Sequence, residues 1–344
     1  MHKVDDKAAI ATDARGGLRS TPPNKKGTKP MIGRRKLLAA APLAPFARSA
    51  LASTGPAAGD APMGVSRFRV GAFSVTAISD GFLPLPVELF PDLPAERYDA
   101  LLEGARFRQN VYTGGVAAFL VEAAGRRILI DAGTGPVMGP TLGRFKAMFG
   151  ALGFDPSDVD LVLATHLHPD HIGGLIADGD TPFVNAEIVV GTADAAFWTD
   201  HGMRSQFPEG FRPFFDLASG VLDTFEDRLR MVSKEADVSP GITAVPLPGH
   251  TPGHMGYRIE SEGDVVLMWG DVVHAAPIQL PQPAIGIVFD VDQQAAAQTR
   301  KRTLDMVVSD RMFVIGSHLP FPGFGAIERS GDGFRFIQSH WEFT

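Results

Sequence analysis

The sequence contains no cysteine. This absence excludes disulfide bonds, thiolate metal ligands and cysteine nucleophiles together. It is compatible with an oxidising compartment but does not demonstrate one. Any metal ion that this chain binds must therefore be held by histidine, aspartate or glutamate.

An excess of positive charge is also missing, as is any apolar run of membrane-spanning length. The formal net charge is −7 over 344 residues. Proteins that bind a nucleic-acid backbone recruit Lys and Arg, so this charge argues against such a partner. A membrane helix needs about 20 apolar residues, and no run of that length occurs. With 44% hydrophobic and 21% charged residues, the composition is typical of a globular protein.

Residues 1–52 are organised like a disordered polar extension followed by an export signal. The pair Arg34-Arg35 precedes a short apolar segment, and Ala50-Leu51-Ala52 supplies a small-x-small cleavage site. This order of regions is typical of a twin-arginine signal peptide. We therefore expect a periplasmic or secreted protein with one domain over residues 53–344. The alternative to the export signal is a merely disordered basic tail. Residues 1–30 are either disordered or, if synthesis starts at Met31, an upstream extension.

The rest of the chain alternates between strand-rich and helical stretches. Apolar alternation predicts hairpins, apolar runs predict short strands, and three stretches are typical of helices. The predicted hairpins span residues 68–78, 116–131 and 325–337, the strands 160–164, 188–190, 242–246, 265–269 and 312–315, and the helices 141–150, 192–200 and 292–307. Residues 203–235 are predicted to be either a helical excursion or a long loop over a site. The repeated rhythm predicts an α/β protein with two similar layers in a single domain.

Ligand-type side chains follow four of the predicted strands. Ligands placed at strand ends sit on a rigid frame and can converge at one edge of a sheet. They are His166, His168, Asp170 and His171 after the first strand, and then His250, Asp271 and His318 after three later ones. In extended backbone, residues two apart point the same way, so the first three face one side together.

Five histidines and two aspartates exceed the four ligands of one tetrahedral site and suffice for two catalytic metal ions. Imidazole and carboxylate suit zinc, and also iron, manganese or cobalt. We predict two divalent ions, with zinc expected. His166, His168 and His250 are assigned to the first metal, Asp170, His171 and His318 to the second, and Asp271 to a bridge between them.

These residues resemble the metallo-β-lactamase superfamily over about residues 67–340. The motifs that carry the resemblance are His-x-His-x-Asp-His at 166–171, Leu-Pro-Gly-His-Thr-Pro-Gly-His at 247–254, Trp-Gly-Asp at 269–271, Gly-Ser-His at 316–318 and Leu-Ile-Asp-Ala-Gly at 129–133. The resemblance implies an αβ/βα sandwich. We expect Asp131, in the last of these motifs, to orient metal ligands from behind.

Within the superfamily, the chain is most similar to methyl parathion hydrolase-like enzymes, through residues 139–144, 193–198 and 317–323. The likeness implies an exported dizinc hydrolase of phosphotriesters, with relatives that cleave esters and lactones. Quorum-quenching lactonases carry a tyrosine three residues after the bridging aspartate. Here that position is His274, so their tyrosine-assisted step is not available as such.

Four side chains near the metals have further predicted roles. Asp170 is a catalytic candidate that could accept a proton from the nucleophile. His274 could donate a hydrogen bond to substrate or leaving group, or could equally serve as a support or packing residue. Trp198 and Phe321 are candidates for an apolar substrate wall, with plain core packing as the alternative for both.

The predicted function is a dinuclear metal-dependent hydrolase. A hydroxide bridging the two metals would attack a small-molecule ester, lactone or organophosphate triester. One alternative is a thioester hydrolase of the glyoxalase II type, which would favour a basic patch that is not evident here. Another is a non-catalytic metal-binding protein, which would bind metal without turnover. Residues 82–112 are expected either to form a homodimer contact or to pack onto their own domain.

Overall fold

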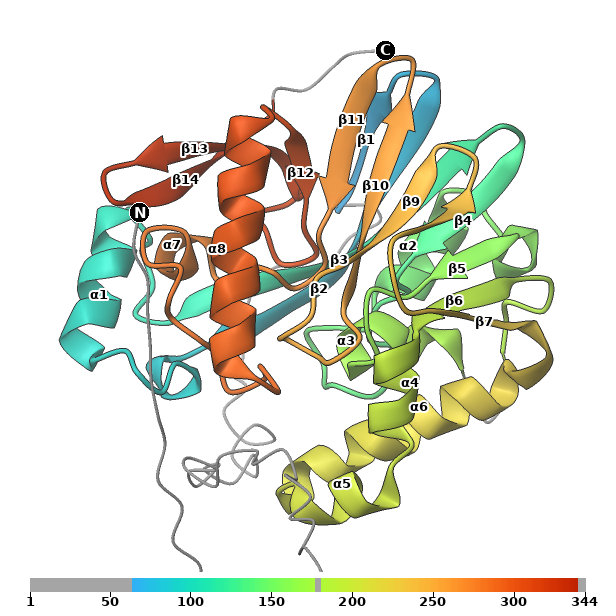
Figure 1. Ribbon diagram of the computed structural model, residues 1–344, viewed down its shortest axis with the longest axis horizontal. Coiled ribbons are helices and arrows are strands. Elements are labelled where there is room, and N and C mark those ends of the chain that lie inside the picture. The colour runs from blue at the N-terminus through green and yellow to red at the C-terminus, as the bar shows by residue number, and fades with distance from the viewer. Residues whose placement is uncertain (1–63, 177–180, 340–344) are drawn as a thin grey trace, which may run out of the picture. The chain divides into compact units, whose positions relative to one another are not determined.

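Two seven-stranded sheets make up the body of the protein, with strand orders β1-β2-β3-β4-β5-β6-β7 and β14-β13-β12-β11-β10-β9-β8 (Figure 1). The computed structural model describes residues 64–176 and 181–339. The predicted export signal and the domain boundary after residue 52 lie outside these ranges. No helix in the described ranges combines the length and apolar character that a membrane crossing requires.

The first sheet joins antiparallel hairpins to a parallel edge. Its strands are β1 (Val65–Val70), β2 (Phe73–Leu85), β3 (Tyr112–Ala123), β4 (Arg126–Ile130), β5 (Leu161–Leu163), β6 (Glu187–Gly191) and β7 (Leu229–Val232). From β4 to β7 each strand runs parallel to its neighbour. The three residues of β5 are all buried, as expected of a strand covered on both faces.

The second sheet repeats this arrangement with a single parallel pair, β11 with β12. Its strands are β8 (Ala236–Ser239), β9 (Ile242–Pro246), β10 (Met255–Ser261), β11 (Asp264–Met268), β12 (Phe313–Ile315), β13 (Phe324–Ser330) and β14 (Gly333–Gln338). Strand β10, which was not predicted, buries Met255, Tyr257 and Ile259 in alternation between two partners.

Helices cover the outer faces of both sheets (Figure 1). They are α1 (Ala95–Gly104), α2 (Phe145–Ala151), α3 (Pro169–Ile172), α4 (Thr192–Trp198), α5 (His201–Gln206), α6 (Arg212–Thr224), α7 (Ala276–Gln279) and α8 (Gln293–Ser309). Phe215 of α6 packs in one outer cluster with Val162, and Leu304 of α8 packs in another with Val314. A third apolar cluster fills the space between the sheets. The predicted αβ/βα sandwich is therefore confirmed.

The structure distinguishes between the alternatives for residues 203–235 and shows how residues 82–112 pack. Residues 203–235 contain most of α5, all of α6 and the strand β7, so the helical alternative is the observed one up to residue 224 and the strand that follows was not predicted. Residues 82–112 pack onto their own domain, where Phe90 and Tyr98 contact a cluster that includes Ile278. The Tyr98 hydroxyl donates to the Leu85 carbonyl and accepts from the Tyr112 amide, both at 2.8 Å. The predicted homodimer stays a prediction.

Candidate metal centre

The structure brings all seven predicted ligands together at one edge of the sandwich. His166 to His171 follow β5 of the first sheet, and the other ligands follow β9, β11 and β12 of the second. Both sheets therefore contribute to one site. Two sets of donor atoms converge there, the first from His166, His168 and His250, and the second from Asp170, His171, Asp271 and His318. A third group, of His250, Asp271 and His274, shares one residue with each of these sets.

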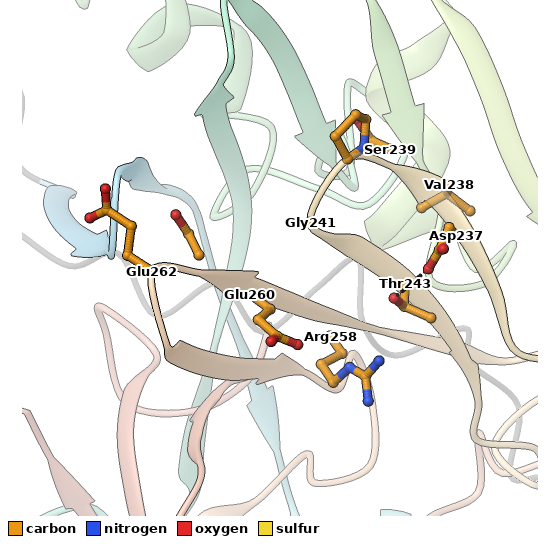
Figure 2. A pocket seen from close by; sticks show the side chains of 10 residues that line it. Asp237, Val238, Ser239, Gly241, Thr243, Arg258, Glu260 and Glu262 are labelled. Carbon is orange, nitrogen blue, oxygen red and sulfur yellow. Dashed lines mark hydrogen bonds between the residues drawn. The ribbon is translucent and has the colours of Figure 1, made fainter.

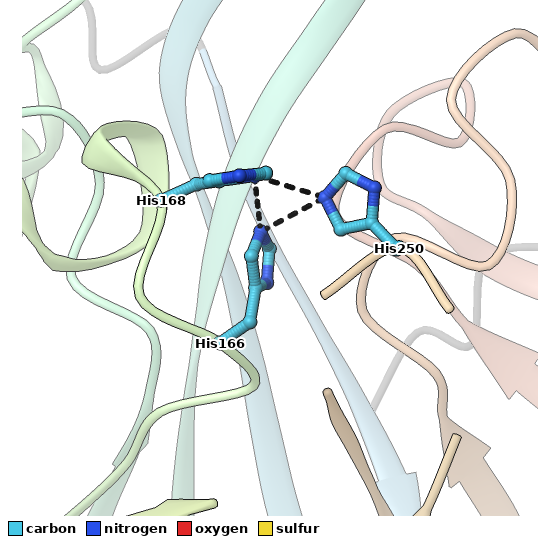
Figure 3. A group of neighbouring side chains, drawn as sticks. All are labelled: His166, His168 and His250. Carbon is cyan, nitrogen blue, oxygen red and sulfur yellow. Dashed lines mark hydrogen bonds between the residues drawn. The ribbon is translucent and has the colours of Figure 1, made fainter. Parts of the chain in front are cut away.

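The first set is a triangle of ring nitrogens (Figure 3). His166 Nε2 lies 3.0 Å from His168 Nδ1, and His250 Nε2 lies 3.1 Å and 2.9 Å from these two atoms. Three neutral imidazoles cannot satisfy such a triangle by hydrogen bonds, because at least two of the three nitrogens must share the same role, donor or acceptor. Nitrogens bound tetrahedrally to one zinc ion would lie about 3.3 Å apart. The triangle therefore fits a metal ion better than a hydrogen-bonded cluster.

The second set is built from two carboxylates and two imidazoles. His318 Nε2 lies 3.1 Å from Asp271 Oδ2 and 3.4 Å from Asp170 Oδ2. His171 Nε2 lies 3.2 Å from Asp271 Oδ1 and 3.5 Å from Asp170 Oδ2. Both His171 Nε2 and Asp271 Oδ1 are buried without a hydrogen-bond partner in the described residues. Buried polar atoms rarely stay unpaired, and a metal ion would satisfy both.

Asp271 lies between the two sets. Its Oδ2 atom is 3.1 Å from His318 Nε2 in the second set, and 3.4 Å from His250 Nε2 and 3.8 Å from His166 Nε2 in the first. This is the position expected of a bridging carboxylate. The residues present therefore fit two divalent ions.

Buried acceptors hold the far nitrogen of three of these histidines. Asp131 Oδ2 lies 2.8 Å from His171 Nδ1, as predicted for a residue that orients a ligand from behind. The Gly115 carbonyl oxygen lies 2.7 Å from His318 Nδ1, and Asp290 Oδ1 lies 2.9 Å from His250 Nδ1. Each acceptor fixes the proton on Nδ1 and leaves the Nε2 lone pair free for a metal.

His254 acts on the backbone of the bridging aspartate. Its Nδ1 atom donates to the Leu247 carbonyl at 3.0 Å, and its Nε2 atom accepts from the Asp271 amide at 3.0 Å. Gly270, at φ +55°, has no room for a side chain, because a Cβ there would lie 2.6 Å from His254 Nε2. Burial lowers the pKa of His254 to about 3, so its imidazole is neutral and can accept this hydrogen bond.

Asp194 of α4 links the two histidine-bearing loops, a role that was not predicted. One carboxylate oxygen accepts from the Leu167 amide at 3.2 Å and the Thr251 hydroxyl at 2.8 Å, and the other accepts from the Gly253 amide at 2.6 Å. Burial raises the pKa of Asp194 to about 6, against the effect of these hydrogen bonds. The carboxylate therefore fixes His166 to His171 relative to His250.

The ligands influence one another's charge. Burial lowers the pKa of His166 and His168 well below the usual value, and neighbouring imidazoles lower both further. Burial also opposes the charged form of His171, but the carboxylates of Asp271, Asp170 and Asp131 together raise its pKa well above the usual value. His166 and His168 are thus neutral imidazoles ready to bind a metal, whereas in the second set His171 must release a proton.

A narrow cavity opens onto both sets of ligands. Its apolar wall consists of Leu83, Leu85, Met138, Phe214 and Phe289, and its polar lining of His168, Asp170, His250, Asp271, His274 and His318. Neither Trp198 nor Phe321 lines it. Trp198 is 1% exposed and lies edge-on behind His168, with ring centroids 5.2 Å apart. Phe321 packs against the core between the sheets, so packing accounts for both side chains and other aromatics form the wall.

His274 lines the cavity beside the bridging aspartate. Its Nε2 atom lies 3.1 Å from Asp271 Oδ2, and its ring stacks on that of His318 with centroids 5.3 Å apart. Burial lowers the pKa of His274 to about 4, which makes the imidazole neutral near pH 7. Its Nδ1 atom is buried without a hydrogen-bond partner in the described residues. His274 is therefore placed to offer a hydrogen bond within the cavity.

A second hollow lies along β8, β9 and β10, away from the histidines (Figure 2). Asp237, Arg258, Glu260 and Glu262 line it together with small side chains. Asp237 accepts a hydrogen bond from Thr243 at 2.8 Å. Every set of converging ligand atoms in residues 64–176 and 181–339 belongs to the histidine site instead.

Comparison with known proteins defines the class of this fold and site. The family model described as "Metallo-beta-lactamase superfamily" matches residues 111–318. The chain belongs to the metallo-beta-lactamase superfamily. A curated relative, an N-acyl homoserine lactonase of Bacillus sp, is 26% identical over 169 residues. That match covers 48% of this chain and 58% of the relative, so the chain spans little more than half of the lactonase's length.

Two solved structures match over most of their length. The hydrolase AbOPH of the beta lactamase superfamily has a TM-score of 0.77 and 28% identity, covering 81% of this chain and 98% of that one. AidC, a dizinc quorum-quenching lactonase, has a TM-score of 0.77 and 23% identity, covering 82% and 100%. The second likeness shows the fold alone. The specific resemblance to methyl parathion hydrolase is not among these findings and stays a prediction.

Proposed function

We propose that this protein is a dinuclear metal-dependent hydrolase that opens lactones or cleaves neutral esters. The observation that carries the proposal is the convergence of seven buried or nearly buried ligands in two sets that share Asp271. A binding-only site does not need a second set of ligands beside an accessible cavity. The lactonase relatives and the hydrolase neighbour support the same reaction type.

Two divalent ions bound here, expected to be zinc, would supply Lewis acidity and lower the pKa of a water toward 7. The protein's own side chains supply the proton acceptor, the hydrogen-bond donor and the apolar wall. Asp170, 14% exposed at the cavity, is placed to accept a proton from the attacking nucleophile. With Asp271 bound to the metal ions, the single proton of the neutral His274 imidazole would be available for a hydrogen bond to the substrate's leaving oxygen. Phe214 and Phe289, on the apolar wall of the cavity, would contact an apolar part of the substrate.

The cavity favours a neutral substrate with an apolar arm. Five of its lining residues are apolar, and neither Lys nor Arg is among its lining residues in the described ranges. An anionic thioester, as in the glyoxalase II alternative, would need such a cation. Phosphotriesters are neutral too and are our second candidate, because a phosphoryl centre can use the same pair of metal ions.

A substrate panel tests this proposal. Purified protein with measured metal content would be assayed on an acyl homoserine lactone, an aryl ester, a phosphotriester, a β-lactam and a glutathione thioester. We expect the lactone or the aryl ester to give the highest kcat/KM. Turnover confined to the thioester would overturn the substrate class, and bound metal without turnover on any compound would favour the non-catalytic alternative.

The His274→Phe variant tests whether His274 donates a hydrogen bond to the leaving oxygen. Phenylalanine keeps the ring and its stacking on His318 but removes both nitrogens. Loss of one hydrogen bond to the leaving oxygen is expected to lower kcat by roughly 10- to 100-fold, with metal content unchanged. The effect should shrink for esters with better leaving groups, because these need less help on departure. Equal kcat values for variant and wild type on every ester would show that His274 has only a packing role.

A further inference from the structure

A buried arginine lies behind the metal site, on α8. Arg300 is 1% exposed, and its side chain spans several segments of the chain. Its Nε donates to the Val272 carbonyl at 2.7 Å, and one terminal nitrogen donates to the Pro283 and Ile285 carbonyls at 3.0 Å and 2.9 Å. Val272 is the residue directly after Asp271. The guanidinium thus holds the backbone of the bridging ligand.

The same guanidinium reaches the first set of ligands through Asp290. Arg300 Nη2 lies 3.5 Å from Asp290 Oδ2, and the other oxygen of this carboxylate lies 2.9 Å from His250 Nδ1. The Asp290 side chain is 0% exposed. Burial opposes the ionisation of Asp290, but the hydrogen bond to His250 Nδ1 and the positive charge of Arg300 hold its pKa at about 2. An ion pair and a hydrogen bond therefore connect Arg300 on α8 to the metal ligand His250.

Backbone contacts seat the His250 loop on the start of the same helix. The Val291 amide donates to the His250 carbonyl at 2.8 Å, and the Asp292 amide donates to the Gly249 carbonyl at 3.0 Å. Gly249 is at φ +134°, and a Cβ there would lie 2.3 Å from the Ala296 amide nitrogen. Only glycine permits this approach. The His250 loop and α8 therefore form one packed unit.

Gln279 joins the His274 segment to this network. Its side-chain oxygen accepts from the His274 amide at 2.7 Å and from the Ala275 amide at 3.2 Å. Its side-chain nitrogen donates at 3.1 Å to the Ile285 carbonyl, which also accepts from Arg300. One arginine therefore connects the loops that carry His250, Asp271 and His274.

We propose that Arg300 is a positioning residue that sets the distance between His250 and Asp271, acting through Asp290 and the Val272 carbonyl. The inference rests on the proposed metal centre, to which Arg300 contributes no ligand. Burying a charged pair costs solvation free energy, and apolar residues of similar volume often stabilise a fold as well. A planar guanidinium provides what they cannot, a rigid fork that fixes several acceptors at once.

The test uses the full-length protein with the variants Arg300→Lys and Asp290→Asn. Arg302→Lys, an exposed position on the same helix, is the matched control. Zinc affinity would be measured by competition with a chromophoric chelator, and ligand geometry by the visible spectrum of the cobalt-substituted protein. Lysine keeps the charge but cannot reproduce the fork, so Arg300→Lys should weaken zinc binding by roughly 10- to 100-fold and change the cobalt spectrum. Arg302→Lys should change neither.

The Asp290→Asn variant distinguishes a loss of His250 positioning from a general loss of folding. Its amide oxygen can still accept from His250 Nδ1, so the variant should retain more zinc affinity than Asp290→Ala, which has no acceptor. If Arg300→Lys does not fold, the zinc affinities of Asp290→Asn and Asp290→Ala test the positioning role instead, and Asp290→Asn should bind zinc more tightly. Wild-type affinity and an unchanged cobalt spectrum in Arg300→Lys, or equal affinities for the two Asp290 variants, would overturn the positioning role. If the wild type itself binds no zinc, the proposed function fails instead.

Discussion

Asp271→Asn is expected to lower kcat/KM for hydrolysis by at least about 1,000-fold, equivalent to about 4 kcal/mol of transition-state stabilisation. Asp271 Oδ2 lies within 3.4 Å of a nitrogen from each ligand set, through His250 and His318. Asparagine removes the negative charge and replaces one carboxylate oxygen with an amide NH2 group, whose nitrogen is a poor metal ligand because its lone pair is delocalised into the carbonyl. Both metal positions are weakened at once, so we expect the metal content to fall from two ions per chain to one or fewer.

Asp264→Asn is the matched control for this variant. Asp264 is the exposed first residue of β11, the strand that leads to Asp271, and it accepts a hydrogen bond from the Gly71 amide at 3.1 Å. The same chemical change there should leave activity and metal content near wild type. An Asp271→Asn variant with two bound ions and more than about a tenth of the wild-type rate would show that this carboxylate is not the bridge.

Removal of the metal ions by a chelator is expected to lower the melting temperature by roughly 10 °C and to abolish hydrolysis. Metal that binds only the folded chain stabilises it by about 4 kcal/mol at 1,000 times its dissociation constant, and in a domain of this size each kcal/mol corresponds to roughly 2–4 °C. Without the ions, the Asp170 and Asp271 carboxylates face each other across His171 and His318. Calorimetry before and after chelation measures the shift.

The His168→Ala variant supplies the control for this comparison. It removes one corner of the nitrogen triangle, so added zinc should raise its melting temperature less than that of wild type. An identical response to zinc in the two proteins would place the stabilising metal elsewhere. A melting temperature that chelation does not change would mean that these seven side chains need no metal to stay folded.

The ligand set could be predicted from the sequence because its chemistry is local. Four ligand-type side chains stand within six residues, and each remaining ligand follows a short apolar strand. The fold could be predicted for a related reason, since hairpins such as β13 and β14 have clear alternation and a glycine turn. Strand β10 has the same signal, in Met255, Tyr257 and Ile259, directly after the second histidine motif.

The supporting residues could not be predicted, because their roles depend on distant contacts. Asp290 and Arg300 lie 40 and 50 residues after His250, in segments whose composition is that of an ordinary loop and helix. Asp194 likewise reaches Gly253, 59 residues away. Trp198 is a predicted candidate for the apolar wall, with core packing as the alternative, but α4 turns that ring toward Phe215 and leaves the cavity to Phe214. Side-chain direction on a helix depends on packing that a motif does not record.

The most direct measurement is a zinc titration of the metal-free protein, with bound metal and the rate of lactone or ester hydrolysis followed in the same sample. The account predicts that hydrolysis is absent without metal and rises to its maximum as the second equivalent binds, with Asp271→Asn giving no such rise. Full hydrolysis in the metal-free protein, or a maximum reached with no zinc bound at these ligands, would contradict it.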